Sequence, residues 1–159
     1  MKFLNTKTSL VLFVSLGLLL GSTVIATADG EKNYFNELAN VFKTMSQDMQ
    51  KLGNQAQDYS KKKEAKSELE GEAKKHKENA FQMLKKVISL TSEAPNASFH
   101  SKVVNNVSDW YLATRLWEEG LKEGDNKKLS AMEQVVHVVS KDSKEFVQEV
   151  SSKTDQDEG

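Results

Sequence analysis

The chain has 159 residues, no cysteine and one proline, and its 22 basic and 23 acidic residues give a formal net charge of −1 at pH 7. Without cysteine there is no disulfide framework and no thiolate metal site. The balanced charge argues against a nucleic-acid partner, because such binding requires a concentrated positive field. The low proline content favours long helices over a sandwich of short strands.

Residues 1–28 have the pattern of a secretory signal peptide. Two lysines precede an apolar run over 10–25, and an Ala-Thr-Ala sequence that ends at Ala28 has the small-x-small pattern that a signal peptidase cleaves. The apolar run is short for a helix that crosses a membrane. We therefore expect cleavage near Ala28, export from the cell, and a secreted mature chain with a net charge near −3, because the two lysines are lost.

Apolar residues recur with gaps of three and four along the rest of the chain, which is the period of amphipathic helices in a bundle or coiled coil. The stripes predict helices at about 31–59, 64–92, 98–122 and 127–152. Pro95 separates the second helix from the third, and two glycines end the third. We predict an all-α, up-down four-helix bundle over 29–152, followed by a disordered acidic tail at 153–159.

Three alternatives to this arrangement stay open. The run Val135–Val139 consists of strand-forming residues. The stretch 61–78, rich in lysine and glutamate, permits one continuous helix in place of a turn near 59–63. Heptads of this kind also fit a homodimer, because an apolar stripe does not determine whether its partner helices come from the same chain or from a second copy.

The predicted third helix is apolar on two sides. Its main stripe contains two tryptophans, whereas Leu112 and Leu116 point nearly away from that stripe. Either this helix is the most enclosed of the four, or its second face contacts a partner. We expect Leu112, Leu116 and the neighbouring Arg115 to contact a protein or an envelope component.

A second hypothesis is a carrier of a small apolar ligand. Met45 and Met49 on the first helix, with Trp110 and Trp117 on the third, would line a pocket between helices. Large aromatic side chains more often dominate ordinary core packing, so the same residues also fit a filled core.

Catalytic and metal-binding patterns are missing from the sequence. Glu72/His76 and Glu133/His137 are spaced i,i+4, whereas carboxylate-bridged di-iron bundles use i,i+3 pairs with inward glutamates on the partner helices. His76 is the one plausible catalytic centre, and a partly buried structural histidine is the alternative. We expect a non-enzymatic protein that needs no cofactor and no metal.

Two asparagines, Asn96 and Asn106, lie in sequons for N-glycosylation, which matter only in a eukaryotic source.

Other short segments carry a family resemblance: Tyr-Phe-Asn-Glu-Leu at 34–38, Ala94-Pro95 before Phe99-His100, and the break at 120–125. With these segments the chain resembles small secreted or lipid-anchored helical proteins of Gram-positive bacteria. The resemblance implies an exported helical protein and carries no activity or site residues. This chain lacks the cysteine that bears the lipid in the anchored members.

Overall fold

The computed structural model describes residues 29–61 and 66–154, and every regular element in these ranges is helical. In chain order the elements are α2 (Asp29–Ser60), α3 (Lys66–Ser89), the short 3-10 helix η1 (Thr91–Glu93), α4 (Ala97–Glu123) and α5 (Asn126–Thr154). The described ranges contain no strand, so the all-α prediction is confirmed and the valine-rich run is helical. The predicted signal peptide lies outside the described residues.

The helix boundaries decide one of the open points and correct the predicted start of the tail. α2 ends at Ser60 and α3 begins at Lys66, so the chain does not continue as one helix through the lysine-rich stretch. α5 runs to Thr154, so the first two residues of the predicted tail are helical, and the rest of that tail lies outside the described residues.

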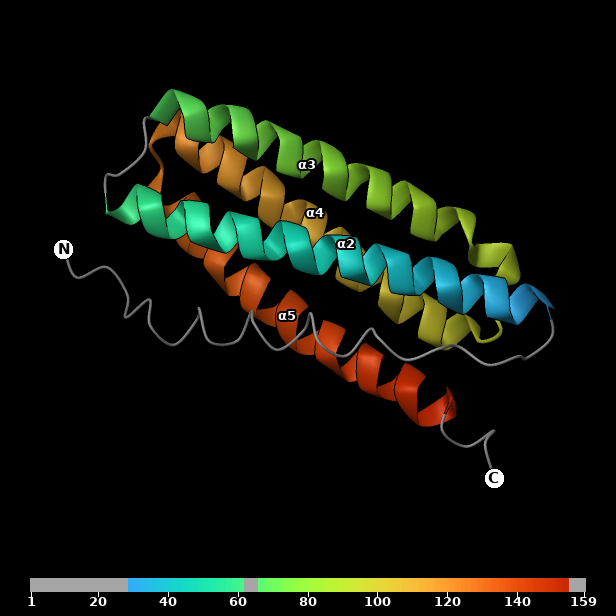
Figure 1. The fold of residues 1–159 in the computed structure, drawn as a ribbon. Coiled ribbons are helices and arrows are strands. Elements are labelled where there is room, and N and C mark those ends of the chain that lie inside the picture. Colours follow the sequence, from blue (N-terminus) through green and yellow to red (C-terminus); the bar gives the residue numbers. More distant parts are fainter. Residues whose placement is uncertain (1–28, 62–65, 155–159) are drawn as a thin grey trace.

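α4 is the central helix of the bundle. It packs along α3 on one side and along α5 on another, whereas α2 packs chiefly against α3. α2 and α4 run in the same direction, because the Tyr34 ring lies 5.7 Å from His100 and the Tyr59 ring lies 6.0 Å from Trp117 between ring centroids. α3 and α5 lie on opposite sides of the bundle (Figure 1).

The predicted stripes of α2, α4 and α5 form the core. Every stripe residue of α4 is buried, and so are the central stripe residues of α2 and α5. The buried members are Leu38, Phe42, Met45, Met49 and Leu52 on α2, Phe99, Val103, Val107, Trp110, Thr114, Trp117 and Leu121 on α4, and Met132, Val136, Val139, Ser143 and Phe146 on α5. Removal of this apolar surface from water is the main force that holds the helices together.

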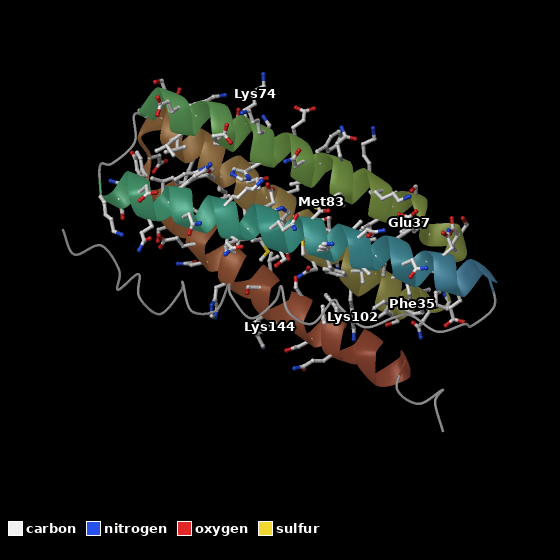
Figure 2. The ribbon with its side chains drawn as sticks, in the orientation of Figure 1. Phe35, Glu37, Lys74, Met83, Lys102 and Lys144 are labelled. Atoms are coloured by element: carbon white, nitrogen blue, oxygen red, sulfur yellow. The ribbon has the colours of Figure 1, made fainter. Side chains whose placement is uncertain are left out.

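α3 buries a slightly different face from the predicted one. An apolar stripe from Ala73 through Ala80 can continue by steps of three and four to Leu84, Val87 and Thr91, which is the face that the sequence spacing favours. Met83 and Leu90 are the buried residues at these levels instead. The observed gaps alternate strictly between three and four, which is the 3.5-residue period of a left-handed bundle. Met83 accordingly lies between α3 and α2, whereas Lys74 points away from the bundle (Figure 2).

Local hydrogen bonds set the ends of α4 and α5. The side chain of Asn96 accepts a bond of 2.9 Å from the backbone N–H of Phe99 and so caps the N-terminus of α4. Gly124 ends α4 in the left-handed conformation with φ of 66°. Asp125 then accepts a bond of 2.8 Å from the N–H of Lys127 at the start of α5.

Gly120 lets α4 and α5 approach closely next to this turn. A Cβ atom at this position would lie 2.6 Å from Cδ2 and 2.9 Å from Cγ of Leu129. Gly71 on α3 has the opposite surroundings, because a Cβ there would meet nothing within 4 Å. Only the first glycine is therefore required by packing.

Candidate functional site

The second apolar side of α4 is partly open to solvent. Leu112 is 41% exposed, whereas Leu116 is half-buried and packs against the core. Arg115 is exposed and donates from Nη2 to Oε1 of Glu119 over 3.2 Å. The three predicted contact residues therefore share one side of α4, but only Leu112 and Arg115 are exposed enough to reach a partner without rearrangement.

α3 extends this apolar side. Phe81 is 42% exposed, and its ring lies 5.6 Å from the half-buried ring of Tyr111, between centroids. The ammonium group of Lys85 lies 5.7 Å from the Phe81 centroid, within the range of a cation–π contact. This aromatic pair thus joins α3 to α4 at the residue that precedes Leu112.

α5 extends it on the other flank. Val138 is 48% exposed and is four residues before Asp142, whose charge acts on Asp109 of α4. Asp109 is three residues before Leu112, and residues three or four apart share a helix face. Val138 therefore lies on the same side of the bundle as Leu112. We call the resulting surface the outer face, formed by Phe81, Tyr111, Leu112, Leu116, Val135 and Val138.

The charges around the outer face are largely paired. Hydrogen bonds from Lys128 (3.0 Å) and Arg115 (3.2 Å) lower the pKa of Glu119 and keep its carboxylate ionised. Burial, with a further contribution from the neighbouring Asp142, raises the pKa of Asp109. Asp109 is thus the carboxylate of this surface whose charge is disfavoured.

The residues of the predicted ligand pocket meet inside the core. Met45 and Met49 on α2, and Trp110 and Trp117 on α4, are all buried, and Tyr59 packs edge-on against Trp117. Within the described residues, the indole N–H groups of both tryptophans have no hydrogen-bond partner. A buried donor without a partner costs free energy, so these two N–H groups are the polar feature of this region.

A buried polar cluster joins α2 to α3. Nδ1 of His76 lies 2.7 Å from Oδ1 of Asp48, and Nε2 lies 2.9 Å from Oε1 of Gln55. The side chains of His76 and Asp48 are only 4% and 7% exposed. Both ring nitrogens of His76 therefore have hydrogen-bond partners within the protein.

A second buried cluster closes the opposite end of α2. Nδ1 of His100 lies 3.0 Å from the hydroxyl of Tyr34, and Nε2 lies 3.1 Å from Oγ1 of Thr91. Burial lowers the pKa of His100, and it raises the pKa of Tyr34 to about 12. His100 thus links three elements, α2, η1 and α4.

α4 also carries buried polar links to its two neighbours. Asn106 is 2% exposed, donates 3.1 Å to the carbonyl of Val139 and accepts 2.9 Å from the hydroxyl of Ser143. Its side-chain nitrogen is therefore inaccessible to glycosylation in the folded chain. On the other flank, the buried carboxylate of Glu118 forms an ion pair with Lys77 of α3.

The spacing of the apolar stripe of α4 indicates the burial of two of these polar residues. His100 precedes Val103 by three residues, and Asn106 precedes Trp110 by four, so both occupy positions with stripe spacing. Asp48 has the same spacing, three residues after Met45 and four before Leu52, on the flank of α2 that α3 covers.

The described residues contain neither a metal-binding cluster nor a membrane-spanning helix. No three histidine, aspartate or glutamate side chains in the described ranges are grouped so that they could hold a metal ion. None of the helices described here is both long enough and apolar enough to cross a membrane.

In the comparisons with known proteins, no family model, no curated protein and no solved structure matches the chain.

Proposed function

We propose that this protein is an exported, non-enzymatic helical bundle that binds another protein through the outer face, at or outside the cell surface. The observation that carries the proposal is the exposure of Phe81, Leu112 and Val138, which are large apolar side chains on three neighbouring helices. Isolated exposed apolar residues are common, but a patch that crosses three helices is typical of an interface.

The composition of the outer face favours a protein partner with an apolar surface. Its centre contains an aromatic pair and leucine, and its rim contains Arg115 and Lys85, a pattern that matches protein interfaces with an apolar core and a polar rim. Arg115 is already paired with Glu119, so it offers little uncompensated charge to a polyanion. Nucleic acid is a poor partner for a chain of net charge −1.

Export rests on the N-terminal sequence pattern. The proposal includes removal of residues 1–28 near Ala28 and an up-down order of the four helices after cleavage. The common direction of α2 and α4 and the short connections support that order. Mass spectrometry of the protein recovered outside the producing cell tests the cleavage, since the intact chain is 17.8 kDa and the mature chain is lighter.

The docking proposal is tested with Leu112→Asp, with Gln47→Asp as the matched control. Gln47 is exposed on α2, away from the outer face, so both variants add one carboxylate to an exposed helix position. Leu116 is left unchanged, because its half-buried side chain packs against the core. A photocrosslinker is placed at Ser108, one turn before Leu112 on α4, in each background.

The expected result is a crosslinked protein in the wild-type and Gln47→Asp backgrounds, and its loss in Leu112→Asp with unchanged helicity. Hydrogen exchange of the isolated complex would then show protection on α3 and α4 around Phe81 and Leu112. A crosslink that survives Leu112→Asp, or protection confined to α2, would refute docking through the outer face.

A second candidate function is a carrier of a small ligand that has an apolar body and a hydrogen-bond acceptor. The unpartnered N–H groups of Trp110 and Trp117, in the same buried core as Met45 and Met49, are the observation that favours it. Native mass spectrometry after gentle purification tests it. An added mass of a few hundred daltons supports the carrier, a bare monomer contradicts it, and a bare dimer indicates that the outer face joins two copies of this chain.

A further inference from the structure

The hydrogen bonds around His100 define which ring nitrogen carries the proton. The hydroxyl of Thr91 donates its hydrogen to the carbonyl of Ile88 over 2.6 Å, so toward His100 it can only accept. Nε2 is therefore the donor, and Nδ1 accepts from the hydroxyl of Tyr34. The burial that raises the pKa of Tyr34 to about 12 keeps this hydroxyl protonated at ordinary pH. The chain of three side chains is complete with a neutral imidazole.

A second proton on His100 breaks this chain. Nδ1–H would point at the Tyr34 hydroxyl, which would have to turn its own hydrogen toward surroundings that exclude water, since Tyr34 is fully buried. The imidazolium would also be a buried cation whose two hydrogen-bond partners are neutral hydroxyl groups. Burial also lowers the pKa of His100, which likewise disfavours the imidazolium.

The charged side chains at this end of the bundle are paired with other residues or exposed to solvent. Glu93 of η1 accepts a bond of 2.8 Å from Asn33 of α2. Glu37 of α2 pairs with Lys86 of α3 at 3.2 Å, and Lys102 of α4 is exposed. None of these charged side chains acts on the His100 ring strongly enough to oppose the effect of burial, which is the one cause of its pKa shift.

The same end of the bundle contains an aromatic cluster that α2 covers. The cluster is a chain of ring contacts between three helices, with centroids 5.9–6.2 Å apart. Its members are Phe35 and Phe42 on α2, Phe99 on α4 and Phe146 on α5. α2 is also the helix that packs least extensively against the rest. Detachment of its first turns would expose these rings to solvent.

We propose that Tyr34, His100 and Thr91 form a proton-sensitive clasp: protonation of His100 detaches the first turns of α2 and uncovers the aromatic cluster. The open end then presents an apolar surface in mildly acidic surroundings that the closed bundle hides at neutral pH. This device is independent of the outer face, because its residues lie at the end of the bundle where α2 and α4 begin.

The direction of the pH effect follows from linkage. His100 has a lower pKa in the closed state than its ordinary value of 6.5, so the open state binds the proton more tightly. The clasp is fully stabilising above pH 6.5, and the stabilisation is lost as the pH falls below that value. The population of the open state rises by up to about tenfold for each pH unit until the folded-state pKa is reached.

The test is carried out on the protein as the cell produces it, with three readouts between pH 7.5 and 5. The fluorescence of 8-anilinonaphthalene-1-sulfonate reports exposed apolar rings, hydrogen exchange over 33–42 reports the opening of α2, and NMR follows the titration of each histidine ring. The expected result is a rise in dye fluorescence and in exchange over 33–42, with a common midpoint at the His100 titration and below pH 6.5.

His100→Gln removes the titrating group and keeps a neutral polar side chain, and the exposed His137→Gln is the matched control. The pH response should disappear in His100→Gln and persist in His137→Gln. Should His100→Gln not fold, the wild-type data decide. Exchange that does not change with pH, exchange that increases equally in all helices, or a His100 midpoint at or above 6.5 would each overturn the clasp.

Discussion

Two glycines in helix interiors should respond in opposite ways to alanine. Gly71→Ala adds a methyl group where nothing lies within 4 Å, so the gain in helix propensity should stabilise the protein by roughly 0.5–1 kcal/mol. Gly120→Ala gains the same propensity but places Cβ 2.6 Å from Cδ2 and 3.3 Å from the backbone nitrogen of Leu129. Overpacking of this kind costs about 1–3 kcal/mol, so the net effect should be a loss of about 1–2 kcal/mol.

The assay is urea denaturation followed by circular dichroism and tryptophan fluorescence, with thermal unfolding as a check. The two variants should differ by the cost of overpacking, about 1–3 kcal/mol, which corresponds to a difference of up to about 10 °C in Tm for a domain of this size. The double variant Gly120→Ala/Leu129→Ala should lose less stability than the sum of the single variants, because the contacting side chain is gone. If Gly120→Ala stabilises as much as Gly71→Ala, the close approach of α4 and α5 is wrong.

Three further substitutions test other local features. Gly124→Ala should cost about 1 kcal/mol, because alanine disfavours the φ of 66° at this cap, and the urea midpoint measures it. Asp48→Ala should cost about 3 kcal/mol, since it leaves the buried His76 without its carboxylate; an unchanged Tm would contradict the buried pair. Asp109→Asn should stabilise by a few tenths of a kcal/mol at pH 7. The raised pKa of Asp109 makes its ionised form unfavourable above the ordinary value of 3.8, so this gain should vanish at pH 3.

The sequence predicted the helices well, because their apolar period is long and regular. The α4 stripe from Phe99 to Leu121 is buried as expected. α3 was less predictable. Its apolar residues occur both at 83 and 84 and at 87 and 88, so the spacing alone did not decide which face would turn inward.

The candidate site was only partly predictable. The second apolar side of α4 could be found from Leu112 and Leu116, but the contributions of Phe81 and Val138 depend on which helices flank α4. Helix order in space is a tertiary property that the periodicity of one helix does not contain. The burial of Asp48 was missed for the same reason, since its histidine partner comes from another helix.

The buried polar links have a consequence for how this sequence can change over time. Each link joins residues far apart in the chain: Asp48 with His76, Tyr34 with His100, and Asn106 with Ser143. Loss of one member leaves the other buried without its hydrogen-bond partner, which costs free energy. Apolar core residues, in contrast, tolerate exchange for other apolar residues of about the same volume. In homologous sequences these pairs should therefore change together, and their covariation would reveal the order of the helices without any coordinates.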